Sequence, residues 1–149
     1  MSVKTTSRLS EISNIIGIKD ATGDLSVIKE LVKCCPKDFL LLTGDDATAV
    51  DFLLLGGHGG ISVTANIAPK QLQKVYLAAI AGNAELAKQA NIELENLHKN
   101  LFVEANPIPV KWALHKMGMC SRGIRLPLLE LSSEFRSVIE NDLKELNLV

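Results

Sequence analysis

The chain has 149 residues, of which 47% are apolar and 22% are charged, and its net charge is −1. This length and composition predict one globular body with a real core and exclude a disordered chain. The basic residues are scattered among acidic ones and form no stripe, so we expect no nucleic-acid partner. No apolar run reaches the ~18 residues of a membrane span, and the first residues lack the apolar core of a signal peptide.

The three cysteines, Cys34, Cys35 and Cys120, form no C-x-x-C pair, and their number is odd. Cys34 and Cys35 are neighbours at the end of a predicted helix. This arrangement is typical of free thiols rather than of a disulfide framework or a metal site. We therefore expect a reducing, cytoplasmic location.

The first two thirds of the chain alternate between strand and helix. After a partial helix over 5–12, short β-branched or apolar runs predict strands, and apolar residues spaced three or four apart predict helices. The strands are expected at 15–19, 39–43 and 61–65, and the helices at 24–34, 49–54 and 69–82. The alternation predicts an α/β fold with a parallel sheet and right-handed crossovers.

The last third is predicted to be entirely helical. One helix begins at Asn83 and carries a seam made of Leu86, Ala90, Leu94, Leu97 and Leu101. The prolines at 107 and 109 break it, a helix follows over 110–117, and after a loop a final helix covers 133–146. No linker rich in Gly, Ser or Pro separates the parts. We expect a partial barrel over 1–82 and a helical region over 83–149 packed on it.

Three parallel strands make an incomplete architecture. They leave two open sheet edges, and they are too few to close a barrel, which takes about eight strands. The sequence therefore reads as part of something larger. We expect a self-associated or partner-bound species.

Lys19 is the first candidate for chemistry. It lies where the first predicted strand stops, and the carboxyl ends of parallel strands are where α/β folds place their sites. Ala21 to Asp24 then supply turn residues and a helix N-cap. The alternative is that the lysine only reaches solvent along its alkyl chain, as many strand-end lysines do.

Four other features have structural interpretations. Tyr76 lies within an apolar helical pattern and is expected to pack. His58 lies in a glycine-rich turn and is expected to shape it. Asp45 and Asp46 lack a third carboxylate and are interpreted as helix-capping residues, not as a metal site. The glycine-rich turn at 56–60 precedes a strand and is therefore not a phosphate loop.

Several blocks of the sequence resemble the dihydrodipicolinate synthase family of the pyruvate-dependent class I aldolase/lyase superfamily, in the family's order and spacing. These blocks are Ile16–Asp24 around Lys19, and then 42–46, 55–66, 101–111 and 125–128. The family fold is a (β/α)8 barrel followed by a C-terminal helical region. The resemblance implies that this chain corresponds to the last three strand–helix units of the barrel plus that region, which is the family's C-terminal half.

The resemblance also implies roles for individual residues. Lys19 matches the lysine that forms a Schiff base with pyruvate. Ile61 matches the position whose backbone carbonyl lies beside that lysine and the bound substrate, and Gly44 matches a strand-end glycine lining the pocket. Leu25, Ser26 and Leu55 match a patch that joins dimers into a tetramer in many members. No metal and no organic cofactor is implied.

The family reaction condenses pyruvate with aspartate semialdehyde in lysine and diaminopimelate biosynthesis. Its proton relay of tyrosine and threonine, and an arginine for the second substrate, come from the half that has no counterpart here. We therefore expect a truncated homologue with impaired activity. The alternatives are a non-catalytic remnant that oligomerises and a half-barrel that another chain completes.

Overall fold

A computed structural model describes residues 1–149. Three parallel strands form one sheet in the order β1-β2-β3, where β1 is Gly17–Asp20, β2 is Leu40–Thr43 and β3 is Gly59–Gly60. Gly17 pairs with Leu40, Lys19 pairs with Leu42, and Leu42 pairs with Gly59. The predicted parallel α/β arrangement is therefore present, as an open sheet.

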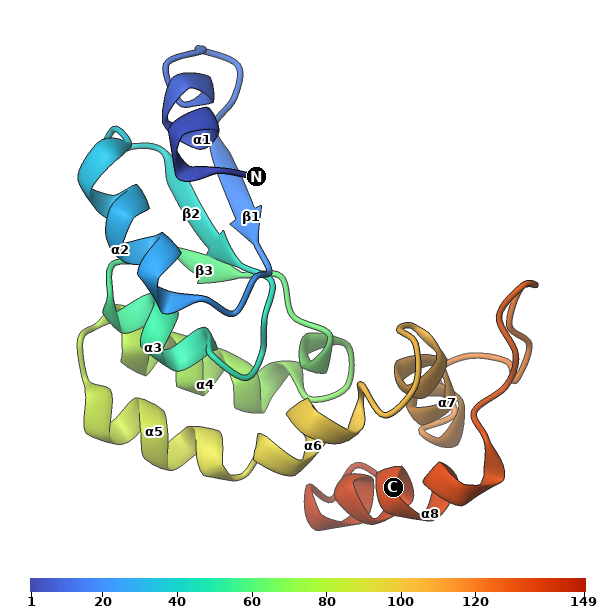
Figure 1. Ribbon diagram of the computed structural model, residues 1–149. Coiled ribbons are helices and arrows are strands. Elements are labelled where there is room, and N and C mark those ends of the chain that lie inside the picture. Colours follow the sequence, from blue (N-terminus) through green and yellow to red (C-terminus); the bar gives the residue numbers. More distant parts are fainter.

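Helices precede, connect and follow the strands (Figure 1). They are α1 (Val3–Leu9), α2 (Leu25–Cys34), α3 (Ala49–Leu54), the short 3-10 helix η1 (Thr64–Asn66), α4 (Pro69–Ile80), α5 (Ala84–Ile92), α6 (Glu95–Asn100), α7 (Ile108–Lys116) and α8 (Ser133–Glu145). In Figure 1 the strands run toward the part of the molecule that the later helices build. Their carboxyl ends therefore face that part.

One small core lies between the sheet and α2. Asp24 caps α2 by accepting a 2.8 Å hydrogen bond from the Ser26 amide, as the turn residues predict. Ile28 and Leu31 are fully buried against this side of the sheet. The buried members of the cluster are Ile28, Leu31, Phe39, Leu41 and Phe52.

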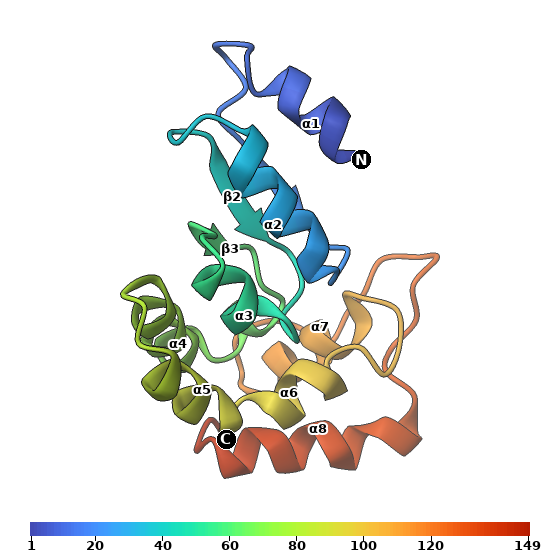
Figure 2. The same ribbon diagram turned by 60° about the vertical axis from the view of Figure 1, so that its left-hand side comes forward.

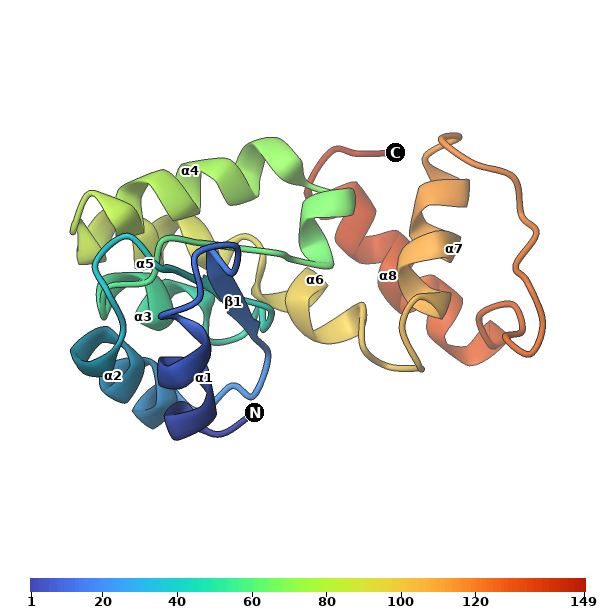
Figure 3. The ribbon, with the colours of Figure 1, turned by 90° about the horizontal axis from the view of Figure 1, so that it is seen from above.

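A larger core joins the later helices to one another and to α3. Its buried residues extend from Val50 in α3 to Leu143 in α8, and include Val75 of α4 and Leu97 of α6. Figure 2 shows α5 lying along α4, with α8 running beneath α6. Seen from above, α7 and α8 extend to one side of the sheet (Figure 3). The predicted boundary near residue 82 thus falls within one continuous apolar cluster.

The predicted third strand over 61–65 is wrong. The strand is β3, two residues long, and the last backbone bond on this side of the sheet runs from the Ile61 amide to the Thr43 carbonyl, at 2.8 Å. Beyond Ile61 the backbone amides bond to side chains: those of Val63 and Thr64 donate to Asp46. Because these amides are taken, the chain turns into η1 instead of continuing the ladder.

The single helix predicted from Asn83 to Leu101 is also wrong, since it is divided into α5 and α6. Leu94, Leu97 and Leu101 of the predicted seam are buried, but Leu86 is 51% exposed. The Leu94 amide bonds to the Asn91 carbonyl in the tight turn between the two helices. The redirected α6 can then pack against α8 while α5 stays beside α4.

Smaller differences occur at other helix ends. Helix α1 stops at Leu9 rather than continuing to residue 12, and α7 begins at Ile108 rather than at residue 110. The second of these follows from Pro109, because a proline is accommodated in the first turn of a helix, where its missing amide has no partner to lose.

No helix combines the length and the apolar character needed to cross a membrane. All three cysteines are free.

Candidate active site

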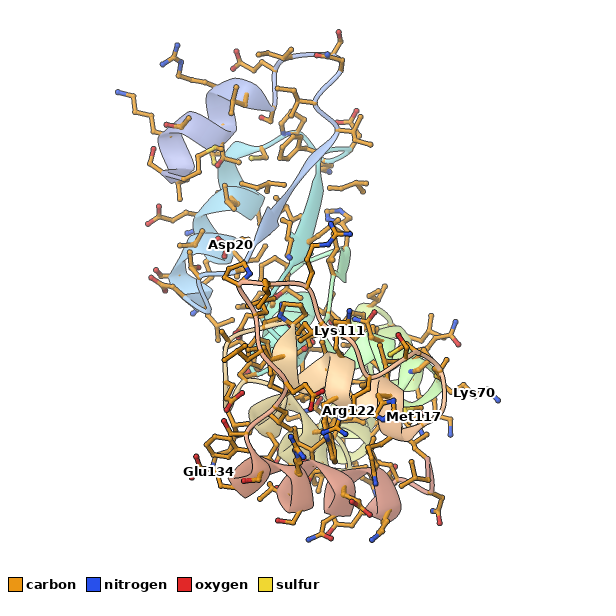
Figure 4. All side chains as sticks on the ribbon, turned by 90° about the vertical axis from the view of Figure 1, so that its right-hand side faces the viewer. Asp20, Lys70, Lys111, Met117, Arg122 and Glu134 are labelled. Carbon is orange, nitrogen blue, oxygen red and sulfur yellow. The ribbon has the colours of Figure 1, made fainter.

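Lys19 lies one residue before the end of β1, on the side of the sheet opposite α2. Its neighbour Ile18 packs with the small core, and successive side chains of a strand point to opposite faces. Lys19 is accordingly exposed. Figure 4 shows Asp20, the last residue of the strand, where the sheet meets the helical part of the molecule.

Gly44 follows β2 directly, and the Lys19 side chain lies across it. A Cβ added at Gly44 would overlap Lys19 Cε and would lie 3.1 Å from Lys19 Cγ and 3.0 Å from Ala21 Cβ. The lack of a side chain at residue 44 therefore gives the lysine its path. The Lys19 side chain therefore lies over the end of β2.

The end of β3 is also built around a glycine. A Cβ on Gly60 would lie 2.8 Å from Tyr76 Cε2 and 2.9 Å from Thr43 Cγ2. Tyr76 packs against the large core, as expected, and its buried hydroxyl has no hydrogen-bond partner. Burial, and then the charges of Asp46 and Asp45, raise the pKa of Tyr76 above its usual range. Ile61 follows with a side chain that is 53% exposed.

The carboxylates of Asp45 and Asp46 accept hydrogen bonds from different segments of the chain. Asp45 Oδ2 accepts hydrogen bonds from the Thr48 amide (3.0 Å) and hydroxyl (2.7 Å). Thr48 is the N-cap residue of α3, so Asp45 holds the turn before the helix and does not itself cap it. Asp46 is only 3% exposed, and its Oδ2 accepts from the amides of Val63 and Thr64, both at 3.1 Å. Asp46 does not cap α3, the helix that follows it in the chain. Its carboxylate accepts from the amides at the start of η1, in the segment after β3.

Thr64, His98 and Asn91 continue this network. Thr64 Oγ1 lies 2.7 Å from His98 Nδ1, and His98 Nε2 lies 3.2 Å from Asn91 Oδ1. Because the Asn91 oxygen can only accept, the proton belongs on Nε2 and Nδ1 accepts from the Thr64 hydroxyl. Burial lowers the pKa of His98, although the charges of Asp46, Glu95 and Asp45 oppose that shift. The imidazole is therefore kept neutral.

His58 has the structural role expected for it. Its Nδ1 accepts a 3.1 Å hydrogen bond from the Leu41 amide, and its own amide donates to the Leu41 carbonyl at 2.8 Å. Both bonds hold the start of β3 against β2. The ring therefore accepts a hydrogen bond from the backbone of β2.

The residues matched to an oligomer patch lie around α2 and the end of α3. Leu25 and Leu55 are half-buried at the small core, and Ser26 is exposed in the first turn of α2. They occupy the helix-covered side of the sheet, away from Lys19. The basic residues Lys111 and Arg122 lie on α7 and on the loop after it (Figure 4), and Arg122 is paired with Glu130 at 2.7 Å.

Comparison with known proteins places this geometry in a family. The sequence matches the model of the Dihydrodipicolinate synthetase family over residues 1–146. The chain belongs to the dihydrodipicolinate synthase family. The 4-hydroxy-tetrahydrodipicolinate synthase of Ruthia magnifica is 57% identical over 147 residues, covering 99% of this chain and 50% of that protein. The Laribacter hongkongensis enzyme of the same name is 59% identical over 145 residues, covering 97% and 50%.

Solved dihydrodipicolinate synthases have the same fold over this length. The enzyme of Acinetobacter baumannii, in a chloride-inhibited complex with pyruvate, superposes with a TM-score of 0.96 at 49% identity, covering 99% of this chain and 51% of that chain. The Aquifex aeolicus enzyme gives 0.95 at 38% identity, covering 99% and 50%. This chain thus spans about half the length of its dihydrodipicolinate synthase relatives, in agreement with the expected C-terminal half.

The sequence pointed to Lys19, Gly44 and Ile61, and all three lie at the carboxyl end of one sheet. The sequence pattern did not predict the hydrogen-bond network that holds the segment after β3. This network consists of Asp46, Thr64, His98 and Asn91. One local signal existed: His98 follows Leu94 by four residues and therefore lies on the buried side of the predicted seam. A histidine on the buried face of a helix needs hydrogen-bond partners, but the sequence pattern does not indicate which residues provide them.

Proposed function

We propose that these 149 residues form the last three strand–helix units of a (β/α)8 barrel and its C-terminal helical region, and that Lys19 forms a Schiff base with pyruvate. The boundary between the two parts lies near residue 82. One observation carries the proposal: in a chain of this family, the Lys19 side chain crosses Gly44 at the shared carboxyl end of three parallel strands. Barrels of this class hold their chemistry at that end.

The chemistry follows from the amine. A neutral lysine attacks the ketone carbon of pyruvate, water leaves, and an iminium forms. The iminium withdraws electrons, so the pyruvate methyl group loses a proton and the resulting enamine adds to an aldehyde, which in this family is aspartate semialdehyde. Burial disfavours a charged ammonium and frees the nucleophile, whereas Lys19 is exposed in this chain. We therefore expect weak activation by these residues alone.

The complete reaction also needs groups that move protons and bind the aldehyde. The 149 residues offer one tyrosine, Tyr76, and its hydroxyl is buried against Gly60. Condensation by this chain alone should therefore be impaired. Ile61 is proposed to present its backbone carbonyl beside the lysine, and Leu25, Ser26 and Leu55 to contribute to contact between subunits.

A second candidate function is a half-barrel completed by another chain. It is favoured by the open sheet face opposite α2, where Leu40 and Ile61 are exposed, and by the half-length match to relatives. The non-catalytic alternative is an oligomerising remnant that covers the same face with further copies of itself.

The test is reductive trapping with pyruvate and borohydride, read by mass spectrometry of the intact protein and of its peptides. We expect one pyruvate-derived adduct on Lys19, absent from Lys19→Ala. Lys70, an exposed lysine on α4 (Figure 4), provides the matched control, because Lys70→Ala should trap as the native chain does. A folded chain with no adduct, or with adducts spread over many lysines, would contradict the proposal.

The completion hypothesis has its own assay. The amino-terminal half of the Ruthia magnifica relative is added as a separate polypeptide, and turnover of pyruvate and aspartate semialdehyde is measured. Completion in trans predicts turnover that neither half gives alone and that Lys19→Ala abolishes. No gain at any ratio of the two chains would exclude completion by this partner.

A further inference from the structure

We propose that Asp46, Thr64 and His98 are positioning residues that hold the segment after β3, and with it the Ile61 carbonyl, in register with Lys19. The inference rests on the proposed function of Lys19 and assigns to this chain a second set of residues that the reaction depends on. None of the three has to touch the substrate.

The sheet by itself stops holding the chain at Ile61. The Ile61 amide makes the last bond to β2, with the Thr43 carbonyl. Two residues later, a single oxygen of Asp46 accepts from two successive amides, those of Val63 and Thr64. Two bonds to neighbouring peptide groups fix both peptide planes, and a buried carboxylate makes strong bonds of this kind. Asp46 therefore holds the backbone of the segment that follows the last hydrogen bond between β2 and β3.

The helical part of the molecule holds the same segment from the other side. Thr64 is fully buried and donates to His98 Nδ1, and the opposite nitrogen of that ring bonds to Asn91. His98 lies on α6, and Asn91 lies on α5. The 3-10 helix η1 is thus clamped between a carboxylate that follows β2 and an imidazole from the helical region.

The clamp matters because Lys19 lies on β1 and Ile61 directly follows β3, and these two strands are not hydrogen-bonded to each other. Strand β2 lies between them, and two strand spacings amount to about 9.6 Å. The Lys19 side chain extends from β1 over Gly44, which follows β2. The position of the Ile61 carbonyl then depends on how the chain is held after β3. Displacements of about 1 Å are enough to slow a reaction markedly.

The experiment uses pairs of variants that differ in one bonding group. Asp46→Ala removes the acceptor, whereas Asp46→Asn keeps an oxygen that can accept both amides. Thr64→Val replaces the hydroxyl by a methyl of similar size, whereas Thr64→Ser keeps it. Thr48→Val is the matched control: it removes an equally short hydroxyl bond, to the neighbouring Asp45. Circular dichroism establishes folding, and if Asp46→Ala does not fold, Thr64→Val carries the test.

Two readouts are taken on the whole chain: the pyruvate dependence of the trapping rate at Lys19, and amide hydrogen exchange over residues 61–67. We expect Asp46→Ala and Thr64→Val to raise the half-saturating pyruvate concentration about tenfold, with a smaller change in the saturating rate. Their Val63 and Thr64 amides should exchange faster. Asp46→Asn and Thr64→Ser should stay within about threefold of the native chain, and Thr48→Val should match it.

The inference is overturned if exchange at 61–67 is unchanged, because the bonds then do not hold the segment. It is also overturned if exchange rises while the pyruvate dependence stays the same, or if Thr48→Val behaves like Thr64→Val. A native chain that forms no adduct at all refutes the proposed function of Lys19, and the exchange comparison still decides whether the clamp exists.

Discussion

At the scale of single residues, the path of the Lys19 side chain depends on a neighbour that has no side chain. The lysine is exposed and flexible, so its position is set by what it can lie against. The residues next to the lysine side chain here are Gly44 and Ala21. A methyl group at residue 44 should therefore displace the lysine, since it overlaps Lys19 Cε, while Ala21 Cβ at 3.0 Å and Lys19 Cγ at 3.1 Å have to give by a few tenths of an ångström.

We predict that Gly44→Ala lowers pyruvate trapping at Lys19 about tenfold and leaves the circular dichroism spectrum and the denaturant midpoint close to native. The added methyl occupies the path of the lysine. Gly123→Ala is the control, because a Cβ at that position meets nothing within 4 Å. Native trapping in Gly44→Ala would mean that the amine does not need this path.

His98 makes stability depend on pH. Burial holds its folded-state pKa below the unfolded value of about 6.5. The contribution of the neutral ring is therefore fully present above that value and is lost as the pH falls through the folded pKa. Each pKa unit of depression corresponds to about 1.4 kcal/mol at low pH.

We predict that the free energy of unfolding, measured with urea, falls between pH 7.5 and pH 5 by more in the native chain than in His98→Gln. The glutamine can bond to both Thr64 and Asn91 and does not titrate. Equal slopes in the two proteins would contradict the assignment.

At the scale of elements, side chains that bond to backbone groups decide where strands and helices end. The β-branched run at 61–65 favours a strand by its composition, yet Asp46 takes two of its amides and η1 forms instead. The long leucine seam favours one helix, yet the chain turns at Leu94 so that α6 reaches α8. Local pattern gave the type of most elements, and tertiary contacts set their lengths.

Substitutions in α8 can test whether the helical region and the sheet region unfold together. Leu143 is fully buried in the large core, whereas Val138 on the same helix is 39% exposed. We predict that Leu143→Ala costs about 2–5 kcal/mol of unfolding free energy and that Val138→Ala costs less than about 1 kcal/mol. The unfolding of Leu143→Ala should remain one transition by both fluorescence and circular dichroism. Two separated transitions would show that the parts are independent.

At the scale of the whole molecule, the sheet has one covered face and one open face. Helices α2 and α3 lie on the covered side (Figure 1). On the other side, Leu40 and Ile61 remain exposed, and β1 and β3 form the two edges of the sheet. Exposed strand edges next to apolar side chains favour pairing with another chain.

We predict that light scattering at micromolar concentration gives a mass of at least twice the 16.2 kDa of one chain. Leu40→Lys should lower this mass, because it places a charge on the open face. Leu86→Lys, at an exposed leucine on α5, should leave it unchanged. A mass equal to a single chain in the native protein would contradict self-association.

The sequence by itself determined the alternation of strands and helices, the family, and the position of Lys19 at a strand end. These features are local: they depend on the periodicity of apolar residues and on motifs a few residues long. Only the tertiary structure decided the two-residue β3, the division of α5 from α6, and the clamp formed by Asp46, Thr64 and His98. The bonds of that clamp join residues 17, 18 and 34 positions apart. Their partners meet only after the chain has folded, so no short pattern specifies them.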